Sequence, residues 1–335
     1  MNLSSNRLVW SGLFISLSLG CWGKGSSGGG DGDSAEDMLW EVMADGVGEG
    51  VLLSAWTDNN TALIVGGDLA GGSGVLVRYD GSTVCVEPEV TERALWWIHG
   101  DGAGEWMAVG EGGTVLIEVD GVRTRNDVPS ESTLFGVWVE DDVAFAVGGD
   151  VDAGTGEAWR LENGEWEAII SDAPGVLFKV WDGWMVGDNV AYFWDDDTGT
   201  AEERPAGERL LTIRGRSDDD VWAVGGTASA AVLHWDGTEW EPINASGLGQ
   251  PLNGVWTIGG ADVWVAGNFG TTAFTDGSGW TMPDLPMTSE HFHAVWPYQD
   301  EMLFLGGNLF SMGDNYGTIG RYGMDSKSLS PEECN

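Results

Sequence analysis

The pair His291 and His293, which directly follows Glu290, is the first candidate for metal chemistry in this sequence of 335 residues. Alternate residues of a β-strand share a face, so both imidazoles of such a pair can approach one ion. The chain holds only four histidines, however, and the other two, His99 and His234, lie far away in the sequence. The sequence therefore does not predict a zinc site.

Two acidic runs, 195–197 and 218–220, carry carboxylate oxygens of the kind that calcium prefers. Neither run has the ligand spacing of an EF-hand loop, so we expect exposed turn residues and no cofactor, with calcium as the alternative. The presence of carboxylates that could pair as in a glycosidase does not indicate that activity in this chain. A chain with 54 Asp and Glu residues can form such pairs anywhere on its surface.

The elements that must position any site come from a sequence repeat of about forty residues. Each copy contains a phrase close to L-x-x-V-W, then V-G-G, then a hydrophobic stretch that ends in D-G-x-x-W. The clearest copy, 210–243, has four short segments rich in Val, Ile and Trp, which is typical of β-strands. The pattern predicts an all-β, seven-bladed β-propeller with four antiparallel strands in each blade. The glycine that ends the second strand recurs at Gly66, Gly110, Gly148, Gly187, Gly225, Gly267 and Gly306.

The 20 tryptophans mostly recur at equivalent places of the repeat, which indicates packing before ligand binding. One set, which follows the Asp-Gly turns as Trp240 does, is expected to cover the outer edge of each blade. A second set ends the inner strands, where His99 and Arg214 replace tryptophan in two copies. The inner set is Trp56, Trp138, Trp181, Trp256 and Trp296.

The seventh copy of the repeat lacks a fourth strand. The segment 38–42, which precedes the first copy, resembles the fourth strand 240–243 of the clearest copy. We therefore expect the N-terminal strand to complete the last blade, which removes a free sheet edge and joins the chain ends.

Six of the seven copies place an acid or an amide directly after the glycines of the second strand, and Thr227 stands there in the remaining copy. In a propeller these side chains open loops on one face, so a ring of them could bind a cation, a sugar or a basic partner. The alternative is turn chemistry, since Asx side chains bond their own backbone. The loop 308–316 adds an apolar contact patch. The candidate ligand-binding residues are Asp68, Glu111, Asp150, Asp188, Asn268, Asn308 and Phe310.

The formal net charge is −40, with only 14 Lys and Arg residues. Proteins that bind nucleic acid gain affinity from many such cations, so the composition excludes that class of partner. The same charge keeps a tryptophan-rich surface soluble and repels anionic membranes.

The N-terminus has the features of an export signal, with one cation at Arg7 and a short apolar stretch at 8–19. Ser18-Leu19-Gly20-Cys21 resembles the lipobox of bacterial lipoproteins, in which the cysteine becomes the lipidated N-terminus. An ordinary signal peptide is the alternative. The expected organisation is a signal peptide at 1–20, a Gly/Ser-rich tether at 21–37, the propeller at 38–323 and a tail at 324–335.

The two remaining cysteines, Cys85 and Cys334, form an even pair in a chain expected to be exported. The ring brings the first and last repeats together, so we expect a disulfide that fastens the closure. Two free thiols are the alternative.

The phrases DVWAVGG and LHWDGTEW, in the copy at 210–243, resemble a repeat found in exported lipoproteins of predatory and marine bacteria. They are more distantly similar to the Asp-box propellers of sialidases and of photosystem assembly factors. The resemblance covers 38–323 and implies architecture rather than activity. The sequence lacks the recurring arginines and tyrosine that sialidase catalysis requires, and 275–280 is only a shortened relative of the Asp-box.

The sequence thus predicts a non-enzymatic, monomeric binding or protein-interaction module, exported and anchored by lipid in the bacterial envelope, at the outer membrane or the cell surface. Its ligand would be a protein or a carbohydrate at one face of the ring, and only the lipid would touch the membrane. The alternatives are a hydrolase or lyase that acts on glycans, and a structural subunit of an envelope assembly.

Overall fold

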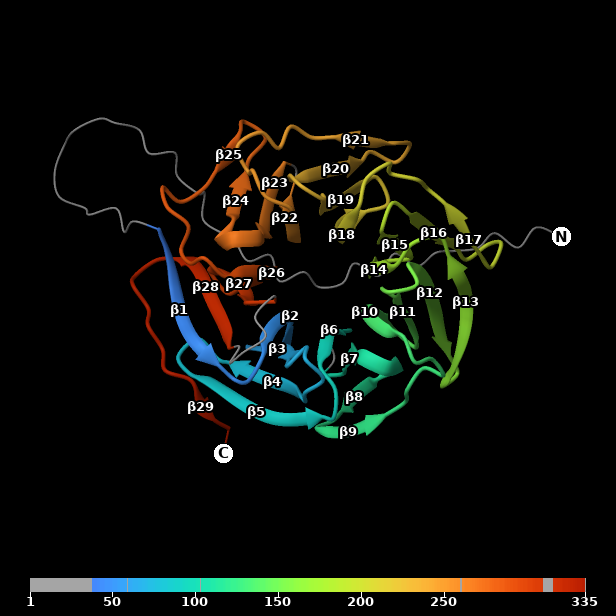
Figure 1. Cartoon of the computed structure of the whole chain (residues 1–335), viewed down its shortest axis with the longest axis horizontal. Helices are drawn as coiled ribbons and strands as arrows, with labels where there is room; N and C mark the ends of the chain where they lie inside the picture. Colours follow the sequence, from blue (N-terminus) through green and yellow to red (C-terminus); the bar gives the residue numbers. More distant parts are fainter. Residues whose placement is uncertain (1–37, 59, 103, 260, 310–315, 335) are drawn as a thin grey trace. The chain divides into compact units, whose positions relative to one another are not determined.

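The computed structural model describes residues 38–334 except positions 59, 103, 260 and 310–315, within one compact unit that spans Asp37–Asn335. Seven antiparallel sheets stand around a common centre, as the sequence predicts. Figure 1 looks onto this ring: the first strand of each blade lies next to the centre and the last lies at the rim. Among the described residues, no helix is long and apolar enough to span a membrane.

The first three blades follow one another along the chain. Their strands are β2 (Val51–Asp58), β3 (Thr61–Gly67), β4 (Gly74–Tyr79) and β5 (Val84–Thr91); β6 (Leu95–Gly100), β7 (Trp106–Gly110), β8 (Val115–Val119) and β9 (Val122–Arg125); and β10 (Thr133–Glu140), β11 (Val143–Asp150), β12 (Thr155–Glu162) and β13 (Glu165–Ala173).

The next three blades repeat the same order, and two short 3₁₀ turns, η1 (Glu111–Gly113) and η2 (Asn268–Gly270), follow the second strands of the second and sixth blades. The strands are β14 (Leu177–Trp181), β15 (Trp184–Gly187), β16 (Ala191–Asp195) and β17 (Thr200–Glu203); β18 (Leu210–Ser217), β19 (Asp220–Gly225), β20 (Ala231–Trp235) and β21 (Trp240–Pro242); and β22 (Leu252–Gly259), β23 (Asp262–Gly267), β24 (Thr272–Thr275) and β25 (Trp280–Thr281).

The last blade is built from both ends of the chain. Its order is β1 (Leu39–Val47), β28 (Gly317–Gly323), β27 (Glu301–Gly307) and β26 (His291–Tyr298), with β1 antiparallel to β28. This confirms the predicted closure, and β1 extends beyond the expected 38–42 segment. Because the N-terminal strand occupies the outer place, β28 is not left as the edge strand, and strands from both ends of the chain meet in one sheet.

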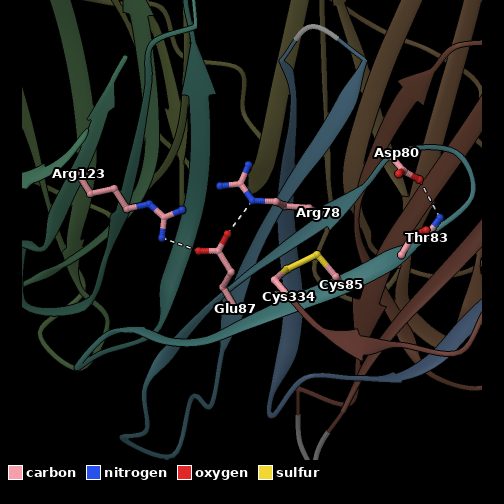
Figure 2. Close-up of a disulfide and its surroundings, with 7 residues drawn as sticks. All are labelled: Arg78, Asp80, Thr83, Cys85, Glu87, Arg123 and Cys334. Atoms are coloured by element: carbon pink, nitrogen blue, oxygen red, sulfur yellow. Dashed lines mark hydrogen bonds and ion pairs between the residues drawn. A yellow bond between two sulfur atoms is a disulfide. The ribbon is translucent and has the colours of Figure 1, made fainter. Parts of the chain in front are cut away.

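The C-terminal segment adds a strand that the sequence does not predict. The two residues of β29 (Glu332–Glu333) pair in parallel with β5, which makes the first blade five-stranded. This pairing brings Cys334 to Cys85, and the structure joins the two as a disulfide (Figure 2). Beside it, Glu87 accepts from Arg78 of its own blade and from Arg123 of the next, at 2.6 Å each.

The tryptophans of the outer strands do more than cover an edge. Trp166, Trp240 and Trp280 each donate the indole N–H to a backbone oxygen 36 to 40 residues earlier, directly after the outer strand of the preceding blade. These bonds tie neighbouring blades together along the rim. The Asp-Gly turns before them form as expected: Asp236 Oδ1 accepts from the backbone of Thr238 at 2.8 Å, and Gly237 takes a φ of +94°.

Candidate functional site

One face of the ring collects the loops that sequence analysis singles out. In every blade the second strand ends opposite the start of the inner strand, as in the pairs Leu95↔Gly110 and Leu252↔Gly267. The loops that follow the second strands therefore share a face with the connections between blades. We call this side of the molecule the loop face.

Two of the predicted ring residues cap their own turns. Asp68 Oδ1 accepts from the backbone N–H of Ala70 at 2.9 Å, and Asp150 Oδ1 accepts from those of Asp152 and Ala153 at 2.9 Å. These are the Asx contacts that the turn alternative describes. In the acidic run 195–197, Asp195 caps the backbone of Asp197 in the same way.

Two other members face a cation. Asp188 Oδ1 lies 3.6 Å from Arg209 Nε, which belongs to the connection that leads into the next blade. Burial raises the pKa of Glu111, and the nearby charge of Arg93 opposes this shift. Asp68, Asp150 and Asp188 are thus each held in a local contact. The charge of Asp68 also adds to the rise in the pKa of Glu111.

The remaining members divide between described and undescribed residues. Asn308 is partly buried at the start of the last loop, while Phe310 and the expected lipidation site Cys21 lie outside the described residues. In the part of the chain that the structure describes, no cluster of three or more His, Cys, Asp or Glu side chains could hold a metal ion.

Asn268 belongs to a connected polar group on the loop face. Its Oδ1 accepts from Asn253 Nδ2 at 3.0 Å and lies 3.2 Å from Nδ1 of His291. Asn253 also donates to the backbone oxygen of Phe292 at 2.9 Å. His291 therefore packs against η2, while a bulge in the strand separates it from His293.

Phe269, in the middle of η2, is exposed in an unusual backbone conformation. Its φ is +53° and the residue is 55% exposed, with the ring centroid 4.7 Å from that of His291. The equivalent residue of the second blade is Gly112, at φ +61°. A non-glycine residue in this region costs about 1–3 kcal/mol and persists only where the surroundings enforce it. The exposed position of Phe269 is thus maintained despite an unfavourable backbone conformation.

A second apolar side chain lies on the connection that packs against η2. The backbone N–H of Gly270 donates to Glu290 at 2.6 Å, and a side chain at position 270 would meet Pro286. Leu285, the neighbour of Pro286, is 80% exposed, and Met282 of the same connection is also exposed. We call the exposed side chains of Phe269 on η2 and Leu285 on this connection the apolar patch.

The apolar contact that the sequence predicts lies in the seventh loop, and the patch at Phe269 and Leu285 is not predicted. A signal was present, because the sixth copy reads Asn-Phe-Gly where the second reads Glu-Gly-Gly. A phenylalanine in place of a turn glycine marks the site. The exposure of Leu285 has no comparable signal, since single exposed leucines are common.

No protein-family model matches the chain, and no curated protein matches it. Solved propellers do resemble it. A structure described as YCF48 bound to D1 peptide matches with a TM-score of 0.62 and 19% identity, over 85% of this chain and 97% of that one. YCF48 from Cyanidioschyzon merolae matches with 0.62 and 15%, over 85% and 98%. The WD40 β-propeller domain of Doa1 matches with 0.63 and 10%, over 85% and 97%. These likenesses, together with the seven four-stranded sheets, show that the chain is a seven-bladed β-propeller.

Proposed function

We propose that this protein is a non-enzymatic interaction module that binds a segment of another protein on its loop face, at the apolar patch. The observation that carries the proposal is Phe269, which is held exposed at φ +53° next to Gly270, the residue that contacts the connection carrying the exposed Leu285. The structurally similar propellers support a binding role, since one of them is described in complex with a peptide. Fold similarity at this level of identity supports the role and does not assign the partner.

An exposed, fixed aromatic side chain such as Phe269 is well suited to anchor a partner. Interfaces draw most of their affinity from a few large side chains that become fully buried, and a ring with few rotatable bonds loses little entropy on binding. Phe269 is already fixed by its contact with His291 and by the turn. Strained backbone of this kind concentrates at functional sites.

The charge of the surroundings restricts the partner. The exposed Asp284 precedes Leu285 in the chain, and Glu290, whose backbone oxygen accepts from Gly270, belongs to the same connection. The whole chain carries −40. We therefore expect a partner segment with an apolar side chain flanked by Lys or Arg, because complementary charge speeds encounter and disfavours acidic competitors.

The proposal includes export and attachment to the cell envelope through a lipid on Cys21. This part rests on the sequence alone, on the apolar stretch 8–19 and the lipobox-like segment. Mass spectrometry of the mature N-terminus tests it: a diacylglyceryl-modified Cys21 supports the anchor, and an unmodified N-terminus beyond Cys21 contradicts it.

The function itself is tested by affinity capture from native envelopes with the wild-type chain and a Phe269→Gly variant as parallel baits. We expect a protein that the wild type retains and the variant does not. In the same preparation, a panel of glycans is assayed for hydrolysis or elimination. Turnover without a captured protein would contradict the proposal and favour the enzyme alternative.

A further inference from the structure

The centre of the ring contains a cation, Arg214, that has no acidic partner among the described residues. One equivalent position of the seven inner strands carries the predicted inner set of five tryptophans together with His99 and Arg214. The guanidinium carbon of Arg214 lies 4.0 Å from the ring centroid of Trp256, 5.5 Å from that of Trp296 and 5.6 Å from that of Trp138. Aromatic faces stabilise a cation but do not neutralise it.

Almost every other described basic side chain has an acidic neighbour. The structure pairs nine of them with carboxylates, and Arg93 lies close enough to Glu111 to oppose the rise of its pKa. Besides Arg214, only Lys179 lacks such a partner among the described residues. In a chain with 54 acidic residues this is a marked exception. Lys179 belongs to the inner strand β14, and its Nζ lies 4.2 Å from the ring centroid of Trp97. We call the space that the seven inner strands surround the channel.

Arg214 remains charged near neutral pH. Burial lowers its pKa to about 9, which is still above the range of ordinary media. Arg214 is partly buried among aromatic rings, and such a charge without an acidic partner is costly because part of its hydration is removed and no carboxylate replaces it. The positive charge of Arg214 in the channel is therefore not compensated by any described carboxylate.

His99, on the inner strand β6, adds a hydrogen-bond donor to the same group. It is only 4% exposed, and its Nδ1 accepts from the backbone N–H of Val139 at 3.1 Å. Burial and the charge of Arg214 hold the pKa of His99 well below its usual value, so the ring is neutral and its proton sits on Nε2. That nitrogen is buried and has no partner among the described residues.

A small cavity of about 20 Å³ lies among these groups. Its lining includes Arg214, His99, the hydroxyl-bearing Thr212 and tryptophans, and it includes no carboxylate. A volume of this size admits roughly one water-sized species. Every lining side chain that is polar can donate a hydrogen bond, and one is a full cation.

We propose that this cavity binds a small monovalent anion of the size of a halide, which neutralises Arg214 and completes the packing of the channel. The proposal is independent of the interaction function, because the cavity lies in the channel and the apolar patch lies on the loop face. The anion stabilises the folded ring by mass action, since the unfolded chain has no such site.

Bromide is the probe, titrated against gluconate at constant ionic strength. We expect a saturable rise in the melting temperature of the wild type, and an anomalous bromide peak beside Arg214 in crystals of the same protein. Arg216→Met, which removes an exposed arginine of the same strand, should keep both signals. Arg214→Met should lose both, and Arg214→Lys should keep a weaker form of each.

Three results would overturn the proposal. They are a melting temperature that responds equally in the wild type and in Arg214→Met, a cavity that holds only water at saturating bromide, and a bromide peak that persists without Arg214. Should Arg214→Met fail to fold, the diffraction experiment on the wild type and on Arg214→Lys decides alone: a peak in both supports the site, and water in both contradicts it.

Discussion

The indole nitrogen of Trp296 donates a hydrogen bond to the hydroxyl oxygen of Thr57 at 2.9 Å, and this bond crosses from the last blade to the first. Next to it, the hydroxyl of Tyr298 donates to the backbone oxygen of Asn60 at 2.5 Å. The N-terminal strand and the C-terminal segment close the same junction from outside, the first by pairing with β28 and the second by pairing with β5. The seam of the ring is thus held at its centre and at its rim.

The disulfide should contribute strongly to this closure. The cysteines Cys85 and Cys334 are 249 residues apart, so the bond restricts almost the whole described chain in the unfolded state. Replacing both with serine should lower the free energy of unfolding by about 2–5 kcal/mol, measured by urea denaturation. The wild type under reducing conditions is the matched control and should lose a similar amount. Equal stability of all three samples would show that the bond does not form or does not matter.

Arg321 should be essential for the seam. It is 1% exposed, and it pairs with Glu41 of the N-terminal strand at 2.6 Å and with Glu301 at 3.3 Å. Arg321→Met leaves Glu41 without its cation and Glu301 with Lys327 alone, so we expect a loss of about 3–5 kcal/mol in chemical denaturation. Arg216→Met, at an exposed arginine, should change stability by less than about 0.5 kcal/mol. Similar losses in both variants would refute a special role for the buried pair.

Phe269→Gly should separate stability from binding. Glycine accepts the left-handed backbone without cost, so the variant should unfold with the same or a higher free energy, by up to about 1 kcal/mol. Binding of the captured partner should weaken at least about tenfold, because the anchor is gone. Denaturation and calorimetric titration of one preparation measure both effects. A destabilised variant with intact affinity would mean that the residue serves packing alone.

Lys179 should make stability depend on pH. Burial lowers the pKa of its amine to about 7 from 10.5, so between these values the unfolded chain binds a proton that the folded chain does not. Stability of the wild type relative to Lys179→Met should therefore rise from pH 7 to pH 10, with a slope of up to about 1.4 kcal/mol per pH unit, and level off below pH 7. The neighbouring His293, whose pKa burial lowers to about 3, stays neutral throughout and does not contribute. Parallel pH profiles of the two proteins would contradict this account.

Much of the fold could be predicted because each blade has its own copy of the same local sequence pattern. The Asp-Gly turns, the valine-rich second strands and the shared phrase near Leu39 were enough to give the blade count and the closure. The parallel strand β29 could not be predicted, since two acidic residues carry no strand pattern and pair only because the chain end returns to β5. The tryptophan bonds along the rim were likewise hidden, because their acceptors are backbone atoms one blade away.

The candidate site was less accessible to sequence reasoning. Acids and amides after the second strands were visible as a pattern, but pattern alone cannot distinguish a shared ligand site from the separate turn contacts of Asp68 and Asp150. The display of Phe269 depends on its backbone angle and on a connection that packs against it from the next blade. The isolation of Arg214 required knowledge of every neighbour in three dimensions.

Site-specific photo-crosslinking tests the central claim, protein binding at the apolar patch, most directly. A photoreactive amino acid is placed at Leu285 on the loop face and, as a control, at the exposed Val122 on the outer strand β9 of the second blade. Illumination in native envelopes should give one protein adduct from position 285 and none from position 122, and Phe269→Gly in the same chain should abolish it. Adducts of equal yield from both positions, or an adduct that is indifferent to Phe269, would contradict the account.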